Sequence, residues 1–184
     1  VFWHTQGSGK SLSMVYYSAK LMATPELENP TIVIVTDRND LDDQLFETFL
    51  ASEDLLRQKP IQCMDRDDIH LHLNNKPAGG IFFTTMQKFQ PKKGETEFKA
   101  LSNRHNIIVG ADEAHRSQYG MKARVDQKTG QMKYGYAHHL RTALPNAGFI
   151  GFTGTPIETE DKDTQHVFGS YVSIYDIEQA QKDE

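Results

Sequence analysis

A short apolar segment, a glycine-containing loop and an amphipathic helix follow one another at the start of the chain. Val1-Phe2-Trp3 is typical of a buried strand, and the loop Gly7-Ser8-Gly9-Lys10-Ser11 comes soon after it. Apolar residues then recur at helical spacing over 11–23, which predicts a helix that begins at the loop. A loop in this position, between a strand and the N-terminus of a helix, is the arrangement that binds phosphate groups.

The residues of this loop have the chemistry that a nucleotide phosphate requires. Small residues at Gly7, Ser8 and Gly9 let backbone N–H groups turn toward an anion. Lys10 supplies a positive charge for the outer phosphates, and Ser11 offers a hydroxyl to Mg²⁺. The full pattern G-x-x-x-x-G-K-[ST] has glycine where this chain has His4, so a purely structural Gly-Ser-Gly turn remains an alternative at this point.

Strand-like and helix-like segments alternate along the rest of the chain. The run at 31–36 is β-branched throughout, as in a parallel strand that is buried on both faces. Similar strands are expected at 81–85, 106–111 and 147–152, with weaker ones at 61–64 and 171–175. Helices are expected at 41–50, 65–74 and 137–144, and an exposed loop or hairpin at 117–136. This alternation predicts an α/β fold, a parallel sheet flanked by helices, with ligands at the carboxyl ends of the strands.

Two acidic residues directly follow one of these strands. Asp112 and Glu113 come after the apolar run at 106–111, where a phosphate-loop enzyme places its magnesium-binding carboxylate. Asp112 is the expected metal residue, and Glu113 the residue that positions or deprotonates the attacking water. An acidic turn without function is the alternative, and the presence of Lys10 upstream argues against it.

Another polar segment, Thr153-Gly154-Thr155-Pro156, follows the last core strand. Its two hydroxyls could form hydrogen bonds that link the Asp112–Glu113 pair to the surface of a moving partner. The same residues are also good turn formers, and their spacing does not decide between these interpretations.

Composition excludes several other classes of protein. There is no apolar run long enough to cross a membrane, and no secretory signal pattern at the start. The net charge of −5 argues against general polyanion binding but leaves room for a local nucleic-acid groove. Cys63 is the only cysteine, which rules out an intramolecular disulfide and suits a reducing cytoplasm.

The histidines and the cysteine give no zinc-binding pattern. His70 and His72 lie two residues apart and His138 and His139 are adjacent, without cysteine partners at metal-binding spacing. A structural zinc site is therefore not expected, and Cys63 is expected to be inert.

Three motifs in order resemble the first RecA-like domain of superfamily 2 helicases and translocases. They are Gln6-Gly7-Ser8-Gly9-Lys10-Ser11, Asp112-Glu113-Ala114-His115 and Thr153-Gly154-Thr155-Pro156. The surrounding residues resemble the motor (R) subunit of type I restriction enzymes over nearly the whole chain. These residues include Trp3-His4-Thr5-Gln6, Thr36-Asp37-Arg38-Asn39-Asp40-Leu41-Asp42 and Phe83-Thr84-Thr85-Met86-Gln87-Lys88-Phe89. In that family a histidine is usual at the position of His4.

The resemblance implies a RecA-like P-loop NTPase domain that couples ATP hydrolysis to translocation of double-stranded DNA, before a separate nuclease domain cuts. ATP and Mg²⁺ would be the cofactors, and the partners would be DNA and the specificity and methylation subunits of a restriction-modification complex. By motif, the catalytic set would be Lys10, Glu113 and His115, and Mg²⁺ would be held by Ser11 and Asp112. Phosphate-cradle residues would be Gln6, Gly7, Ser8, Gly9, Lys10 and Ser11; coupling residues His115, Thr153 and Thr155; and DNA contacts Arg38, Thr85 and Lys88.

The same resemblance predicts how the chain is divided. Residues 1–160 would form the ATP-binding domain, and 161–184 would lead toward a second RecA-like domain. A chain that opens directly on a core strand and a phosphate loop is expected to be part of something longer, with its adenine contact and arginine finger elsewhere. Alone, it is expected to hydrolyse ATP poorly and not to translocate.

Two other functional classes remain as alternatives. The first is a nucleotide-binding switch that signals without doing work, although the chain has no N-K-x-D string and its adjacent Asp112 and Glu113 favour hydrolysis. The second is a non-catalytic scaffold with a P-loop, against which the joint presence of Lys10, Ser11, Asp112 and Glu113 speaks.

Overall fold

Seven parallel strands form one sheet in this computed structural model, which describes residues 1–5, 7–36, 39–89, 100–114, 124–125, 132–133, 136–154 and 168–175. The strand order is β3-β4-β2-β5-β8-β1-β9, and every neighbouring pair is parallel. The strands are β1 (Phe2–His4), β2 (Thr31–Thr36), β3 (Ile61–Gln62), β4 (Ile81–Thr85), β5 (Ile107–Ala111), β8 (Gly148–Thr153) and β9 (Ser173–Tyr175). The predicted α/β fold with a parallel sheet is confirmed.

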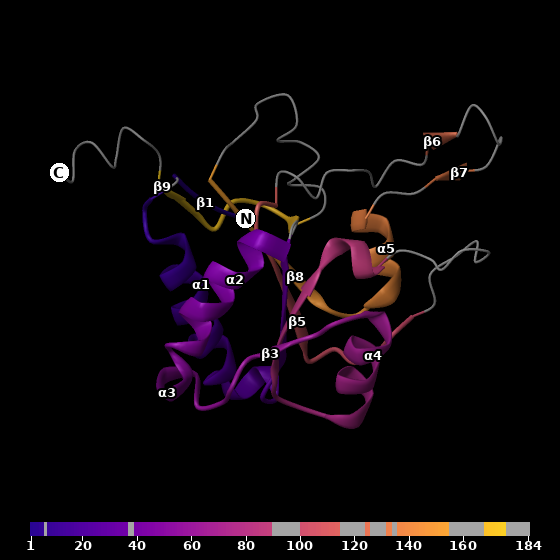
Figure 1. The fold of residues 1–184 in the computed structure, drawn as a ribbon, viewed down its shortest axis with the longest axis horizontal. Helices are drawn as coiled ribbons and strands as arrows, with labels where there is room; N and C mark the ends of the chain where they lie inside the picture. Colours follow the sequence, from indigo (N-terminus) through magenta and orange to yellow (C-terminus); the bar gives the residue numbers. More distant parts are fainter. Residues whose placement is uncertain are drawn as a thin grey trace.

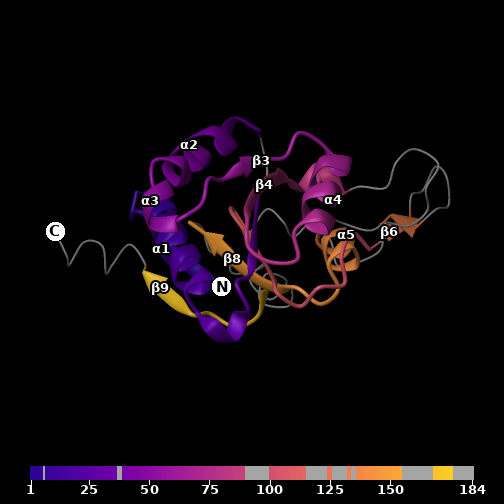
Figure 2. The ribbon, with the colours of Figure 1, turned by 90° about the horizontal axis from the view of Figure 1, so that it is seen from below.

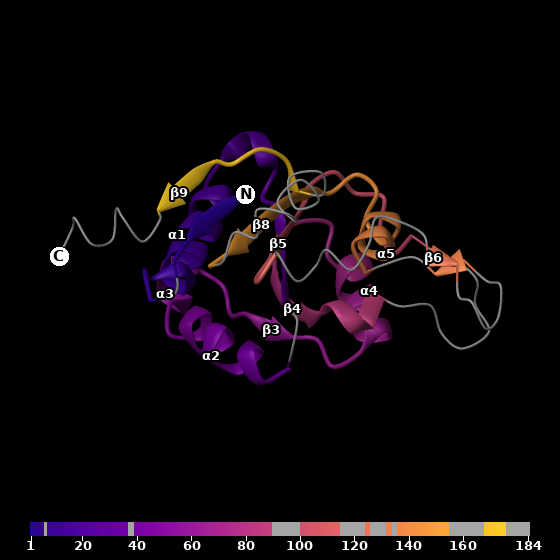
Figure 3. The ribbon, with the colours of Figure 1, turned by 90° about the horizontal axis from the view of Figure 1, so that it is seen from above.

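The centre of the sheet is β2, which pairs with β4 on one side and β5 on the other. All six of its residues are buried, as its uninterrupted β-branched run predicts for a strand covered on both faces. Figure 3 shows the strands side by side from β9 at one edge to β3 at the other.

Helices cover both faces of the sheet. They are α1 (Lys10–Met22), α2 (Asn39–Leu50), α3 (Glu53–Leu56), α4 (Arg66–Asn75) and α5 (Tyr136–Ala143). In Figures 1 and 2, α1, α2 and α3 lie on one side of the strands and α4 and α5 on the other. The arrangement is a three-layer sandwich with the sheet in the middle.

Alternate residues of the strands pack into two separate hydrophobic cores, one on each face of the sheet. One core joins Val33, Val35 and Phe82 to Ile69 and Leu73 of α4 and to Leu140 of α5. The other joins Ile32, Ile34 and Phe83 to Met14 and Val15 of α1, Phe49 of α2 and Leu56 of α3. This division follows from the two-residue period of a strand, which sends successive side chains to opposite faces.

Most differences from the sequence-based prediction are at element boundaries. The strand expected at 61–64 is limited to Ile61–Gln62, and the one expected at 171–175 to Ser173–Tyr175. The short helices α3 and η1 (Pro25–Leu27) were not predicted, because a single turn has too few residues to display a helical period. Directly after β4 the chain forms a 3₁₀ helix, η2 (Met86–Phe89).

Part of the predicted loop at 117–136 is an antiparallel pair of two-residue strands, β6 (Arg124–Val125) and β7 (Met132–Lys133). This pair agrees with the hairpin alternative. Gln6, Arg38, His115 and Thr155 lie outside the described residues. Among the described helices, none has both the length and the apolar character needed to cross a membrane.

Arg104 forms hydrogen bonds with several segments at the amino ends of the strands. Its guanidinium donates hydrogen bonds to Asn106 Oδ1 (2.9 Å), Thr31 Oγ1 (2.6 Å) and the carbonyl oxygens of Leu73 (3.2 Å) and Lys76 (2.5 Å). The arginine therefore fastens the starts of β2 and β5 to the end of α4.

Candidate nucleotide site

The predicted phosphate loop leaves the carboxyl end of β1 and runs into α1. Gly7 and Gly9 have φ angles of 88° and 76°, a left-handed conformation that glycine adopts without strain. Ser8 closes the turn: its hydroxyl donates to the Thr5 carbonyl oxygen at 2.6 Å, and its backbone N–H donates to the same oxygen at 3.2 Å. Gly9 is the N-cap of α1, so Lys10 and Ser11 are the first two residues of the helix.

Lys10 joins two carboxylates that are more than a hundred residues away in the sequence. Its Nζ lies 2.9 Å from Asp112 Oδ1 and 2.7 Å from Glu113 Oε1. Asp112 Oδ1 also accepts a hydrogen bond from the Glu113 backbone N–H at 2.9 Å. The structure thus brings together the lysine and the acidic pair that the sequence predicted to share one site.

This cluster is mostly enclosed. The side chains of Lys10, Asp112 and Glu113 are 18%, 13% and 25% exposed. Burial alone would lower the pKa of Lys10, but attraction by Asp112 and hydrogen bonds to both carboxylates outweigh burial and raise it. Lys10 therefore stays charged across the physiological pH range and is available to neutralise phosphate.

The turn that carries the acidic pair is fixed to the sheet on both sides. The Asp112 backbone N–H donates to Val35 of β2 at 2.9 Å, and the Ala114 N–H donates to Phe152 of β8 at 2.8 Å. Between them Glu113 has a φ of 49°, which is uncommon for a residue with a side chain. Such outliers concentrate at functional sites, where the surroundings hold them in place.

Strand β8 lies between the strand of the phosphate loop and the strand of the acidic pair. Its last residue, Thr153, is opposite Trp3 of β1 and is 2% exposed. A Cβ added to Gly151 would lie 2.7 Å from the Cβ of Ala114 and 3.0 Å from Phe168. No role was predicted for Gly151 from the sequence, because its close approach to Ala114 leaves no local sequence signal.

The described DNA-contact candidates lie at the carboxyl end of β4. Thr85 is its last residue and is 3% exposed. Lys88 follows in η2, where its Nζ donates to the Cys63 carbonyl oxygen at 2.6 Å. Neither residue contacts the Lys10 cluster in the described structure.

The donors present fit a magnesium nucleotide. An added Cβ at Gly7 or Gly9 would meet no atom within 4 Å, so the loop backbone has open space beside it for phosphate oxygens. Asp112 and Ser11 carry oxygen atoms of the kind that Mg²⁺ prefers, and Lys10 carries a charge opposite to that of phosphate.

Comparison with known proteins supports this interpretation. The family model described as SWI2/SNF2 ATPase matches residues 1–184. The chain is 60% identical over 183 residues to the type I restriction enzyme HindI endonuclease subunit of Haemophilus influenzae, and 39% identical to the putative MjaIXP endonuclease subunit of Methanocaldococcus jannaschii. It covers 17% and 16% of the length of these two relatives, which in turn cover 100% and 99% of this chain.

Solved structures give the same fold at low sequence identity. The helicase domain of Pyrococcus furiosus Hef matches with a TM-score of 0.59 at 15% identity, over 98% of this chain and 36% of that one. A yeast DEAD-box splicing factor matches with a TM-score of 0.57 at 16% identity, over 94% of this chain and 41% of that one. The fold is therefore that of a RecA-like helicase domain, and the chain belongs to the SWI2/SNF2 ATPase family.

Proposed function

We propose that this chain is the ATP-binding motor domain of a type I restriction endonuclease subunit, and that it couples ATP hydrolysis to movement of double-stranded DNA. The observation that carries the proposal is the contact of Lys10 with both Asp112 and Glu113. The 60% identity to the HindI endonuclease subunit supports the choice of restriction enzymes over other SWI2/SNF2 ATPases.

In this proposal the loop binds the phosphates. Backbone N–H groups of Gly7 and Gly9 would face the phosphate oxygens, and that of Ser8 would leave the Thr5 carbonyl oxygen to join them. Gln6 would also line this cradle, and the N-terminus of α1 would add its partial positive charge. Lys10 exchanges one of its carboxylate partners for the outer phosphates. Because two carboxylates compete for Lys10 before binding, the exchange requires a new cation for them.

Mg²⁺, when bound, supplies that charge and withdraws electron density from the outer phosphate. Ser11 and Asp112 are the residues that would hold it. Glu113 would orient the attacking water and accept its proton, and its left-handed backbone conformation aims the side chain toward Lys10. His115 is proposed to help couple hydrolysis to movement.

Strand β8 is placed to transmit a change at the site. The Ala114 backbone donates to Phe152 of β8, and Gly151 of β8 packs beneath Ala114. A shift of the acidic turn on hydrolysis would therefore move the end of β8, where Thr153 and Thr155 are the proposed coupling residues.

The proposed DNA contacts are Arg38, Thr85 and Lys88. Of the two that the structure describes, Lys88 is partly exposed and Thr85 is buried, so Lys88 is the stronger candidate for a phosphate contact. The specificity and methylation subunits are the proposed protein partners. Residues 1–160 would form the motor domain, and 161–184, which contributes β9 to the sheet, would lead to a second RecA-like domain.

The test is DNA-dependent ATP hydrolysis by the intact protein that carries this chain, measured beside displacement of a triplex-forming strand from duplex DNA. The wild type should hydrolyse ATP in the presence of duplex DNA and displace the strand, and the Lys10→Ala variant should do neither. Lys20→Ala, an exposed lysine of the same helix, is the matched control and should behave as the wild type. Hydrolysis without strand displacement by the wild type would support a nucleotide switch instead of a motor.

A further inference from the structure

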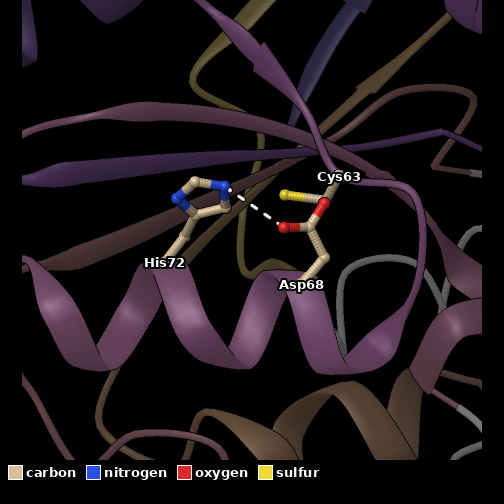
Figure 4. Close-up of side chains that lie close together, drawn as sticks. All are labelled: Cys63, Asp68 and His72. Atoms are coloured by element: carbon tan, nitrogen blue, oxygen red, sulfur yellow. Dashed lines mark ion pairs between the residues drawn. The ribbon is translucent and has the colours of Figure 1, made fainter.

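Cys63, Asp68 and His72 converge where β3 ends and α4 begins. One potential ligand atom from each, the cysteine sulfur, a carboxylate oxygen and an imidazole nitrogen, lies within 4.8 Å of the other two. Figure 4 shows the three side chains pointing toward one another from the strand end and from the helix. None of them belongs to the nucleotide site.

Local structure holds the three residues in this arrangement. The Cys63 backbone N–H donates to Phe83 of β4 at 2.8 Å, which extends the sheet by one residue beyond β3. Asp68 and His72 are one helical turn apart in α4 and so share a face of the helix. Asp65 caps this helix by accepting a hydrogen bond from the Asp68 backbone N–H at 2.8 Å.

The side chains are also oriented individually. Asp68 Oδ2 accepts a hydrogen bond from the Met64 N–H at 2.9 Å, while its Oδ1 lies 3.3 Å from His72 Nε2. The His72 ring stacks on Phe82, with centroids 4.8 Å apart and an interplanar angle of 24°. The ring orientation is therefore fixed by packing as well as by the carboxylate.

We propose that Cys63, Asp68 and His72 bind one divalent transition-metal ion of the zinc class. A thiolate, an imidazole and a carboxylate are the ligands that Zn²⁺ uses in proteins, whereas Mg²⁺ and Ca²⁺ avoid sulfur. Bond lengths of about 2.0–2.3 Å place the ligand atoms of one tetrahedral ion about 3–4 Å apart. The present separations need only a small contraction to reach that range.

The charges around the cluster favour a cation. The thiolate and the Asp68 carboxylate together would balance a divalent ion, and Asp65 adds a further negative charge nearby. The ammonium of Lys88, which donates to the Cys63 carbonyl oxygen, is the opposing positive charge. Asp68 and His72 are 29% and 26% exposed, so water can reach the fourth position of the ion.

Metal binding must remove a proton from the cysteine. Burial, followed by the repulsion of Asp68, raises the pKa of Cys63 to about 12, so the group is a thiol in the metal-free protein. On binding, the S–H bond breaks, the sulfur donates the electron pair to the metal, and the proton passes to solvent. The metal would then fasten the edge strand β3 to α4.

The cluster was not predicted from the sequence, because its spacing, Cys-x₄-Asp-x₃-His, matches none of the cysteine–histidine patterns of structural zinc sites. The strand order separates it from the nucleotide site, since β4 and β2 lie between β3 and β5. The two sites can therefore be tested independently.

The experiment is titration of the purified, chelator-treated and reduced protein with Co²⁺, followed by displacement with Zn²⁺. We expect one equivalent of Co²⁺ to give a thiolate-to-cobalt charge-transfer absorption that Zn²⁺ abolishes. Cys63 is the only cysteine of this sequence, and loss of the absorption in Cys63→Ser would assign it to Cys63 in the intact protein. Asp112→Asn should leave it unchanged, since that residue belongs to the nucleotide site.

Variants identify the other ligands. Cys63→Ser should lose the absorption, and His72→Gln should weaken Co²⁺ binding by about 10–100-fold or more. His70→Gln, an exposed histidine of the same helix, is the matched control and should bind as the wild type. Thermal unfolding of each variant without metal checks that it is folded. Absence of the charge-transfer absorption in the folded wild type at saturating Co²⁺, or equal binding by His72→Gln and His70→Gln, would overturn the proposal.

Discussion

One cation joins several elements at each end of the strands, but the two cations have different partners. At the carboxyl ends of the strands, Lys10 contacts two carboxylates, Asp112 and Glu113. At the amino ends of the strands, Arg104 contacts neutral oxygens of Thr31, Leu73, Lys76 and Asn106. The first cluster could exchange partners when a charged ligand arrives, whereas the second satisfies two backbone carbonyls and two neutral side-chain oxygens. Lys10 is therefore the cation proposed to bind a ligand, and Arg104 is the one that joins loops of the fold.

Of the substitutions that test this difference, Lys10→Ala should have the largest effect, which is on ATP hydrolysis. Loss of one preorganised positive charge at a reacting phosphate should lower the turnover of the intact motor by at least about 10²–10³-fold. The free energy of unfolding should also fall, because Asp112 and Glu113 would lose the cation that offsets their mutual repulsion and partial burial. Steady-state ATP hydrolysis and chemical unfolding measure the two quantities. A turnover close to that of the wild type would show that Lys10 is structural, as Arg104 is.

Arg104→Ala should lower the stability but leave ATP hydrolysis by the folded protein unchanged. Carbonyl and hydroxyl oxygens at the ends of β2 and α4 would lose their donor, which should lower the free energy of unfolding by about 2–3 kcal/mol. Nucleotide affinity of the folded fraction should not change. His105→Ala, the exposed neighbour, should cost within about 0.5 kcal/mol. Arg104→Lys should recover only part of the loss, because an ammonium cannot reproduce the planar fork of a guanidinium.

The connection between β8 and the acidic turn can be tested with Gly151→Ala. The added methyl would meet Ala114 and Phe168 at 2.7 and 3.0 Å, which should cost about 1–2 kcal/mol and weaken nucleotide binding by displacing the turn. Gly148→Ala is the matched control in the same strand, since its methyl would have its closest neighbour, Ile108, at 3.8 Å. Equal stabilities of the two variants in chemical unfolding would contradict the close packing described here.

A smaller effect is expected from His4, which precedes the phosphate loop. Burial lowers the pKa of His4, so between its folded and unfolded pKa values the unfolded chain binds more protons. Its contribution to stability is therefore complete above the unfolded value of about 6.5 and is lost as the pH falls through the lower folded value. The stability of His4→Gln should decline less than that of the wild type below that pH in unfolding experiments. Parallel declines would contradict the assignment to His4.

The sheet could be predicted from the sequence because its central strands are buried on both faces. Such strands appear as continuous apolar runs, and 31–36 and 81–85 coincide with β2 and β4. The contacts of Arg104 could not be predicted, since two of its acceptors are backbone carbonyls that any residue would provide. Single-turn helices such as α3 were missed for lack of a visible period.

The proximity of the residues proposed to bind the nucleotide could also be predicted in part. Lys10 and Asp112 each follow a predicted strand, and the carboxyl ends of parallel strands meet at one edge of a sheet. Their direct contact, and the simultaneous contact with Glu113, depend on the strand order and on the unusual backbone of Glu113. Those features arise from tertiary packing and leave no local pattern.

The central claim is that Lys10, Asp112 and Glu113 form one nucleotide site whose charges are paired with one another before binding. The most direct test is the affinity for ATP, measured by calorimetry in the presence of Mg²⁺, of the wild type, Lys10→Ala and Glu113→Gln. We predict that Glu113→Gln binds at least as tightly as the wild type, because the substitution removes one competitor for Lys10. Lys10→Ala should not bind measurably. Wild-type affinity in Lys10→Ala, or loss of binding in a folded Glu113→Gln, would contradict the account.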